Sequence, residues 1–367
     1  MAGNGTFGER GEMAESRKEA AKLPGRKEYL DILRGLAAVG VIFIHVSANN
    51  WYGYIGSGQW TIFTIYQGIF KASVLIFFEI SGVLYLNGKR EKTLKDLYIR
   101  SVGRLLLFLL FWAFVYKMAR FPWSGGNFSG NLRNACIEIF TGNTETHLWF
   151  LYAIIGLYVL VPVLRPIVHG ASRSQLKYAI AVFFVFGGAC EMLGMFPAFG
   201  VIANNLNKIK AGMSFGYVGS FLLGAYLDRY EVGKKNRIAL YILGILGTIS
   251  TIILVYWDCV SSQMIRERFW TYTMPNVYVS GAAVFLFFKN LSVRNFFTKV
   301  MCKISERSLG IYGVHFLFIL FFWKTGFDTF LFTGILSVPV ISLIILILSY
   351  IVSSVLHRIP KIGRYIA

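Results

Sequence analysis

The chain has 367 residues, of which 56% are hydrophobic and only 15% are charged. An ordinary soluble domain carries about 25% charged residues, so this composition excludes a soluble globular protein and indicates an integral membrane protein. The formal net charge of +19 would suit a nucleic-acid-binding protein, but the distribution of the charges along the chain favours a topological explanation.

Apolar stretches long enough to cross a bilayer, which takes about 20 residues, recur along the chain. Of the 37 Lys and Arg, 26 fall between these stretches on one side of the predicted arrangement and 7 on the other. Basic loops remain in the cytoplasm, so the asymmetry predicts that both termini are cytoplasmic and that nucleic acid is not a partner. We expect an all-α bundle of ten membrane-spanning helices, at residues 29–48, 61–86, 102–118, 147–168, 176–195, 213–228, 238–257, 274–288, 308–323 and 330–356.

Ten spans leave no room for a separate soluble domain. We expect a disordered cytoplasmic tail at residues 1–27, one membrane domain at 28–358 and a short cytoplasmic tail at 359–367. The first tail has no apolar core and is not a cleavable signal peptide. The four cysteines show no metal-like spacing. Cys136 and Cys259 both fall on the predicted outer side, where they could pair, although we favour unpaired thiols.

The first span, YLDILRGLAAVGVIFIHV, carries Asp31, Arg34 and His45. Ionisable residues at mid-membrane cost about 2.5–3.5 kcal/mol on insertion scales and are usually functional. At 100° per residue, Arg34 and His45 differ by about 20° and Asp31 and His45 by about 40°, so the three share one helical face. Arg34 and His45 lie about 16 Å apart along the axis. This stripe suits a long ligand threaded through the bundle, and Asp31 is expected to pair with Arg34 or a neighbouring Arg.

The second span, IFKASVLIFFEISGVLYL, contains Lys71 and Glu79. The two residues differ by about 80° around a continuous helix and would line one cavity on the acceptor side. The alternative is structural, with Lys71 reaching outward to the interface and Glu79 paired with a buried Arg; the two readings have about equal weight.

The loop before the third span ends with Arg100 and Arg104. Four-residue spacing stacks two guanidinium groups on one helical face, which suits phosphate binding. Anchoring by positive charge in the cytoplasm is the alternative, although for Arg104, which lies inside the apolar stretch, we favour a functional role.

The fourth span opens with His147 and Trp149, and the ninth contains His315. For Trp149 the default explanation is an interfacial aromatic belt; His147 either caps the helix or contacts a polar acceptor. His315 is predicted about 10 Å from the cytoplasmic edge, either as a hydrogen-bonded core residue or near the entrance for a donor.

Several chemistries find no support in the sequence. It contains no Walker-type phosphate loop, no G-x-S-x-G nucleophile elbow and no H-E-x-x-H or cysteine cluster. The five histidines are too far apart in the sequence for a local metal-binding motif. They could form a metal site only if the fold brought them together. We expect no metal and no tightly bound cofactor.

Four motifs in order, YLDILRGLAAVGVIFIH, FFEISGVLYL, HLWFLYAIIGLYVLVPVLR and GIYGVH, resemble the acyltransferase-3 family of ten-helix membrane acyltransferases over about residues 28–323. Within this family, the motifs are most similar to those of the bacterial branch that O-acetylates cell-envelope glycans. The family commonly carries R-x-x-R before its third helix, whereas this chain has Arg100-Ser-Val-Gly-Arg104. Ser101 stands where the first Arg would, and Arg100 would substitute from about 100° away on an α-helix.

The resemblance implies an O-acyltransferase in the bacterial cytoplasmic membrane. It would move an acyl group, first of all acetyl, from cytoplasmic acetyl-CoA to a hydroxyl of a glycan or glycolipid at the outer half. His45 matches the family's first-helix histidine, and we expect it to act as general base or to form an acyl-enzyme. Arg34, Arg104, Arg100 and His315 are the expected donor-binding residues. Asp31, Lys71, Glu79, His147 and Trp149 are expected to support the site or contact the acceptor.

Two other functions fit the embedded charges. A transporter or exporter of a glycan or lipid-linked intermediate would also use buried ionisable residues, but the sequence shows no inverted repeat and no paired broken helices. The second alternative is a membrane sensor or an anchor for another enzyme, which the embedded His and Arg make less attractive because such a protein does not need them. Binding of acyl-CoA separates the enzyme from both alternatives.

Overall fold

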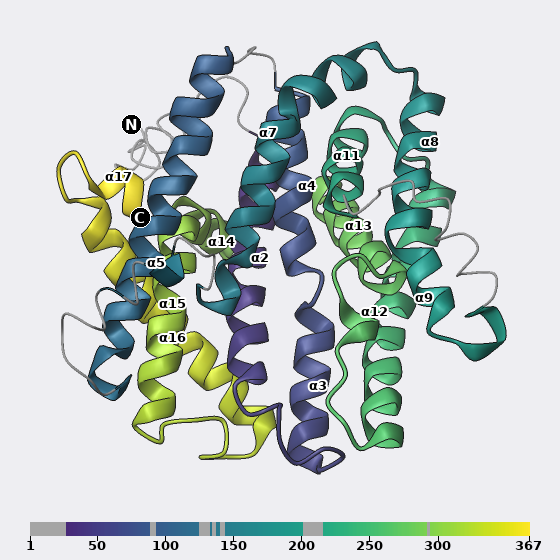
Figure 1. Cartoon of the computed structure of the whole chain (residues 1–367). Helices are drawn as coiled ribbons and strands as arrows, with labels where there is room; N and C mark the ends of the chain where they lie inside the picture. Colours follow the sequence, from purple (N-terminus) through teal and green to yellow (C-terminus); the bar gives the residue numbers. More distant parts are fainter. Residues whose placement is uncertain are drawn as a thin grey trace, which may run out of the picture.

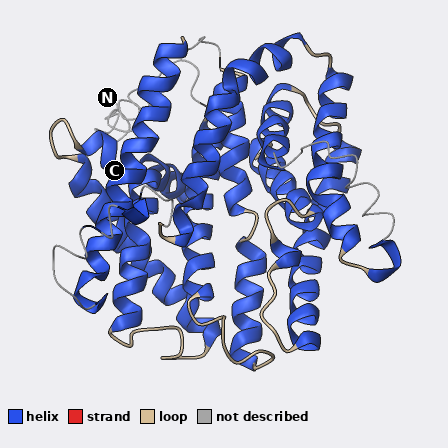
Figure 2. Ribbon diagram, in the orientation of Figure 1, coloured by secondary structure: helices blue, strands red, loops and turns tan. Residues whose placement is uncertain are grey.

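The computed structural model describes residues 27–88, 93–124, 133, 137–139, 144–200, 216–291 and 294–367. Within these residues every regular element is helical and none is a strand (Figure 2), which confirms the expected all-α fold. The expected tail up to residue 26 and Cys136 lie outside the described residues. Cys259 is buried and free.

Most helices run along the long axis of the bundle, with α2 between the others (Figure 1). Short π- or 3₁₀-helical segments, labelled η, connect several of them. The elements are α2 (Glu28–Ala48), α3 (Gly58–Phe70), α4 (Ser73–Leu86), η1 (Asp96–Val102), α5 (Gly103–Ser124), η2 (Thr146–Leu148), α7 (Trp149–Gly170), α8 (Arg173–Phe184), η3 (Val185–Ala189), α9 (Cys190–Gly194), η4 (Pro197–Phe199), α11 (Gly216–Arg229), α12 (Lys234–Ser262), η5 (Arg268–Trp270), α13 (Pro275–Lys289), α14 (Phe296–Glu306), α15 (Ser308–Lys324), α16 (Gly334–His357) and α17 (Gly363–Ile366).

Helix α2 is the element around which the bundle is built. It contacts α3, α4, α13, α14, α15 and α16, and 13 of its residues are buried. Small residues allow this close packing: a Cβ added at Gly35 would lie 2.1 Å from the carbonyl oxygen of Met301 in α14. Gly82 of α4 meets α11 in the same way, because its Cβ would lie 1.8 Å from the carbonyl oxygen of Phe221.

Seven helical segments of the described chain are long and apolar enough to cross a membrane, or eight if the bent pair α14–α15 counts as one span. The expected spans at 213–228 and 274–288 correspond to α11 and α13, which have 14 and 15 residues. At 1.5 Å per residue they are about 21 and 22 Å long, shorter than the hydrocarbon core of about 30 Å. The count of ten crossings and the orientation of the termini therefore stay predictions.

The structure differs from the expected elements in two spans. The span predicted at 61–86 is found as one apolar segment, Gly58–Leu86, with a short interruption at residues 71–72 between α3 and α4, where both residues keep right-handed helical angles. The ninth span is preceded by α14, which meets α15 at an angle of 82°. Because α14 packs against α2, the start of α15 cannot be taken as the start of a membrane crossing.

The segment at 359–367, expected to be a cytoplasmic tail, folds against the bundle. Helix α17 packs on α5, and the indole Nε1 of Trp112 donates a hydrogen bond of 3.0 Å to the carbonyl oxygen of Ile366. Ile366 and Ala367 are buried. Hydrophobic contact with α5 therefore holds this segment, which sequence hydropathy over so few residues does not reveal.

Large apolar side chains are exposed along the outside of the bundle. On α12 they recur at spacings of three and four residues, which places them on one face of the helix. An apolar stripe of this size is what a lipid-facing helix presents. The exposed positions on α12 include Ile238, Ile242, Ile245, Leu246, Ile249 and Ile253.

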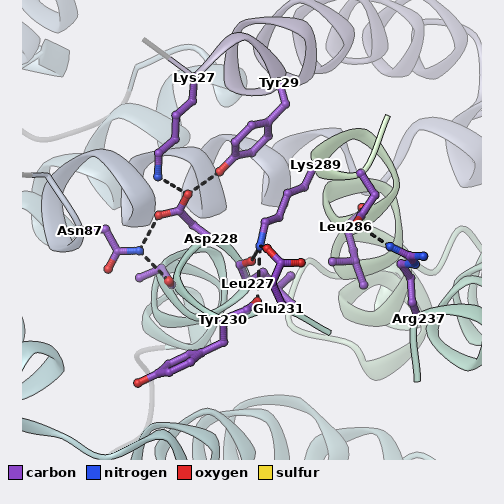
Figure 3. A network of polar contacts seen from close by, with 12 residues as sticks. Lys27, Tyr29, Asn87, Leu227, Asp228, Tyr230, Glu231, Arg237, Leu286 and Lys289 are labelled. Atoms are coloured by element: carbon purple, nitrogen blue, oxygen red, sulfur yellow. Dashed lines mark hydrogen bonds and ion pairs between the residues drawn. The ribbon is translucent and has the colours of Figure 1, made fainter. Parts of the chain in front are cut away.

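A network of polar side chains, which we call the Asp228 network, ties together the ends of four helices (Figure 3). Asp228 of α11 forms an ion pair with Lys27 and accepts hydrogen bonds of 2.7 Å from Tyr29 of α2 and Asn87 at the end of α4. Lys289 of α13 donates to the carbonyl oxygen of Leu227 at 2.7 Å. The network joins α2, α4, α11 and α13 at the end of the bundle where α2 begins.

Candidate active site

One large cavity lies beside α2. Its volume is about 560 Å³, and residues of α2, α4, η1, α5, η2, α7, α14 and α15 line it. This size falls in the range of small-molecule sites. Arg34, Arg100 and Arg104 line one part, which we call the arginine end, and His45 and His147 line another, the histidine end. Because Arg34 and His45 are eleven residues apart on α2, the two ends are separated by about 16 Å.

Three histidines from distant parts of the sequence meet at the histidine end. The ring centroids of His45 and His315 are 5.3 Å apart, those of His147 and His315 5.5 Å, and those of His45 and His147 6.0 Å. They come from α2, η2 and α15. This is the three-dimensional convergence that the dispersed sequence positions left open. The described residues contain no group of three or more His, Cys, Asp or Glu that could hold a metal ion.

Hydrogen bonds orient part of this cluster. The Nδ1 of His315 lies 2.8 Å from the carbonyl oxygen of Tyr312, and since a carbonyl only accepts, Nδ1 carries the proton and Nε2 keeps a lone pair. The hydroxyl of Tyr312 donates to the carbonyl oxygen of His147 at 2.6 Å. Among the described residues, Nε2 of His315 and both ring nitrogens of His147 are buried without a partner. Buried polar atoms are normally paired, so the nitrogens of His147, which lines the cavity, are available to a ligand.

Three guanidinium groups gather at the arginine end. Arg34 Nη1 lies 3.3 Å from Asp31 Oδ1 and 3.4 Å from Ser305 Oγ. Asp31 therefore pairs with Arg34, one of the two partners expected from the sequence. The Nε of Arg104 is buried and has no hydrogen-bond partner in the described part of the chain. Arg100 is 80% exposed and pairs with Asp96 at 3.2 Å. Together these cations favour an anionic ligand.

Arg100 lies in η1, which is a π-helical segment and not the α-helix that the sequence interpretation assumed. A π-helix bonds i to i+5 in place of i+4 and is frequent at functional sites. The wider turn accommodates one additional residue, so the R-x-x-x-R spacing leaves both Arg100 and Arg104 on the cavity wall. That both arginines line the cavity agrees with the shared face expected from their four-residue spacing. Its role in donor binding stays a prediction.

The wall between the two ends combines aromatic and small polar side chains. The rings of Tyr85 and Tyr158 are 4.0 Å apart between centroids, and the hydroxyl of Tyr158 lies 3.5 Å from Ser81 Oγ. All three line the cavity. The sequence interpretation missed both tyrosines, although Tyr85 stands four residues after Ser81 and so on the same helical face.

Trp149 and Tyr272 form an aromatic wall at the histidine end. Their rings are stacked with centroids 5.2 Å apart, and both line the cavity. Trp149 therefore contributes to the site itself and is more than part of an interfacial belt. Tyr272 was not predicted, because it lies in the short segment between η5 and α13 where no helical periodicity indicates a face.

The expected shared cavity of Lys71 and Glu79 is wrong. The two residues lie on different segments, since Lys71 follows α3 and Glu79 belongs to α4. Neither residue lines the cavity. Glu79 is fully buried where α4 meets α11 and α13, and its Oε1 lies 3.4 Å from the Cβ position of Gly281. The ammonium group of Lys71 lies against the rings of Trp270 and Tyr272.

His315 is a buried, hydrogen-bonded core residue, which is the first of the two expectations stated for it. The sequence placed it near the cytoplasmic edge among donor-binding residues, whereas its ring adjoins His45 and His147. Because α14 and α15 meet at an angle of 82°, a count of residues along one continuous helix does not give the distance of His315 from a membrane edge. The position of His315 favours a role beside His45 and not beside the arginines.

Comparison with known proteins agrees with the resemblance seen in the motifs. The model of the acyltransferase-3 family, described as an acyltransferase domain, matches residues 27–358. This range is nearly the whole chain and includes the arginine end and all three clustered histidines. No curated protein and no solved structure matches the chain.

Proposed function

The chain belongs to the acyltransferase-3 family and is a multi-pass membrane acyltransferase, and on that premise we propose that it transfers an acetyl group from acetyl-CoA to a hydroxyl of a cell-surface or lipid-linked glycan. One observation carries the proposal: a single cavity is lined by three arginines at one end and by His45 and His147 at the other, with the ring of His315 packed against both histidines. The family match favours acyl transfer over the transport of a glycan.

The arginine end is suited to the phosphates of the donor. Arg34, Arg100 and Arg104 line it, and charge-assisted hydrogen bonds from guanidinium to phosphate are about twice as strong as neutral ones. The distance of about 16 Å to His45 is comparable to the extended pantetheine arm of coenzyme A. Donor phosphates bound here would therefore present the thioester at the histidines.

His45 is the proposed general base. Its imidazole takes the proton of the acceptor hydroxyl while the oxygen attacks the thioester carbonyl. The C–S bond then breaks, and the imidazolium returns the proton to the departing thiolate of coenzyme A. Positioned general bases contribute about 10²–10⁴-fold to rate. The lone pair on His315 Nε2 and the free nitrogens of His147 provide hydrogen-bonding groups next to this reaction. An acyl-enzyme on His45 is the alternative route.

We place the arginine end on the cytoplasmic side of a bacterial cytoplasmic membrane. The basic loops of the predicted topology support this orientation, and acetyl-CoA is a cytoplasmic metabolite. The histidine end then faces the outer half of the bilayer, where a glycan or glycolipid acceptor arrives.

The experiment is transfer of a labelled acetyl group from acetyl-CoA by the purified full chain in lipid nanodiscs, followed as acetyl-CoA consumption and labelled product. We expect His45→Ala to lower turnover at least about hundredfold while the protein still inserts and binds coenzyme A. His169→Ala is the matched control, since His169 lies outside the cavity and contacts the carbonyl oxygen of Leu86. Retained turnover in His45→Ala would refute the assignment, and absence of coenzyme A binding in the wild type would favour transport.

A further inference from the structure

His147 is a buried imidazole whose two ring nitrogens both lack a hydrogen-bond partner among the described residues. The side chain is 2% exposed and lines the cavity at the histidine end. The lone pair on Nε2 of His315 could accept a hydrogen bond from it, and the two ring centroids are 5.5 Å apart, but no hydrogen bond joins the two rings. Leaving a buried polar group without a partner is costly, so we expect a ligand in the cavity to supply it.

At least one of the missing partners of His147 is an acceptor. A neutral imidazole carries one N–H and one lone pair. A second proton would create a buried charge that no carboxylate of the described residues hydrogen-bonds, and such a charge is very costly. Whichever nitrogen carries the proton, its N–H therefore points to a ligand acceptor. The carbonyl oxygen of a thioester, or the oxyanion formed from it, is such an acceptor.

The backbone and the ring of His147 are both held in place. The hydroxyl of Tyr312 donates to the carbonyl oxygen of His147 at 2.6 Å, and the ring of Phe316 stacks on the imidazole with centroids 4.5 Å apart. Two residues earlier, Glu145 accepts two hydrogen bonds from Arg120 of α5, at 2.5 and 2.8 Å. A donor fixed before the reaction stabilises developing charge without the cost of reorganisation.

His147 also lies next to the proposed general base. The ring centroids of His45 and His147 are 6.0 Å apart, and the ring planes are inclined by 74°. His315 does not line the cavity, so of the two additional histidines His147 is the one that reaches a substrate. In acyl transfer, the attacking oxygen and the carbonyl oxygen become bonded to the same carbon atom. Two neighbouring imidazoles can therefore serve one oxygen each.

We propose that His147 is a second catalytic residue, whose ring N–H donates a hydrogen bond to the thioester carbonyl oxygen and to the oxyanion formed from it. The inference rests on the proposed function. As the acceptor oxygen attacks, its proton passes to His45, the new C–O bond forms, and the π electrons of the carbonyl move onto its oxygen. His147 stabilises this charge and keeps its own proton. The C=O bond then re-forms, the C–S bond breaks, and the imidazolium of His45 protonates the departing thiolate.

The first test is isotope-edited infrared spectroscopy of acetyl-CoA that carries a heavy carbon isotope at the thioester carbonyl, bound to the full chain in lipid nanodiscs. A hydrogen bond weakens the C=O bond and lowers its stretching frequency. We expect the band to lie at lower frequency in the wild type than in His147→Leu, whose side chain cannot donate. His169→Leu is the matched control, because His169 does not line the cavity, and it should keep the wild-type band.

Hydrolysis of acetyl-CoA, with water in place of the acceptor hydroxyl, tests the same donor in turnover. We expect His147→Leu to lower kcat about 10²–10³-fold, and to change the Michaelis constant less than about threefold, because the interaction matters most in the transition state. His147→Asn places an amide N–H near the position of Nδ1, and His147→Gln near that of Nε2. One of these two variants should keep the low-frequency band and a kcat within about tenfold of the wild type.

Three results would overturn the proposal: the same band in the wild type and in His147→Leu, a raised Michaelis constant with unchanged kcat, or equal losses of kcat in the Leu, Asn and Gln variants. Thermal unfolding reports the fold of each variant, and if His147→Leu does not fold, the Asn and Gln variants decide. If water is too poor an acceptor for turnover to be measured, the infrared comparison decides. A wild type that binds no acetyl-CoA would instead count against the proposed function.

Discussion

The Asp228 network and the cavity both contain buried polar groups, but they use them differently. In the network, both oxygens of Asp228 accept hydrogen bonds or an ion pair from neighbouring helices. In the wall of the cavity, Arg104 Nε and both nitrogens of His147 have no partner among the described residues, and neither has Nε2 of His315 directly behind it. Satisfied groups hold helices together, and unsatisfied ones in a cavity await a ligand. The presence or absence of a hydrogen-bond partner, and not the amino-acid type, therefore separates the structural polar residues from the functional ones.

The largest effect on stability is expected from Asp228→Ala. The change leaves Tyr29 without its acceptor and removes one of the two hydrogen bonds of Asn87, which still donates to the carbonyl oxygen of Ala225, so the free energy of unfolding should fall by about 2–3 kcal/mol. Thermal unfolding in detergent measures this loss, and acetyl transfer per folded molecule should persist. Asp228→Asn is the control, since it keeps an acceptor and should lose less. If Asp228→Ala kept its stability but lost turnover, the assignment of the network to structure and of the cavity to function would be wrong.

Arg104→Met is the matching change in the cavity. The Michaelis constant for acetyl-CoA should rise about tenfold to hundredfold, because a charge-assisted contact to phosphate contributes about 1.5–3 kcal/mol. Thermal stability should not fall, since Arg104 Nε has no partner to lose among the described residues. Arg229→Met provides the opposite control: it removes a hydrogen bond of 2.8 Å to the carbonyl oxygen of Val168, and neither residue lines the cavity. A destabilised Arg104→Met with unchanged donor affinity would contradict the proposal.

His315→Gln distinguishes the two ends of the cavity. Glutamine lacks the imidazole lone pair beside His45, so we expect kcat to fall about tenfold, a change of about 1.4 kcal/mol in the activation barrier. The Michaelis constant for acetyl-CoA should stay the same. Steady-state kinetics with varied acetyl-CoA separates these parameters. A raised Michaelis constant with normal kcat would restore the donor-binding role that the sequence suggested.

The smallest effect is expected from Glu79→Gln. Glu79 has no hydrogen-bond partner among the described residues, yet it lies outside the cavity. Glutamine keeps its size and shape, so stability should change by no more than about 1 kcal/mol and turnover by less than twofold. A fall in turnover of tenfold or more would show that a buried group without a hydrogen-bond partner can be functional even outside the cavity.

Much of the site was predictable because helical geometry is regular. Asp31, Arg34 and His45 share a face on one uninterrupted helix, and the structure places Arg34 and His45 at the two ends of one cavity. Predictions failed where the backbone departs from a regular α-helix. The clearest case is the bend of 82° between α14 and α15 before His315; the π-helix at Arg100 and the interruption at residues 71–72 are smaller departures.

The sequence by itself determined the membrane class, the all-helical fold, the family and the polar stripe of α2, because these depend on composition, local motifs and helical period. Only the tertiary structure decided that His147 and His315 join His45, that Tyr272 completes the wall, and that Glu79 stands apart. Such meetings depend on how distant helices pack against one another, which small residues at contacts such as Gly35 permit. No local pattern encodes them, since the partners lie up to 270 residues apart in the chain, as for His45 and His315.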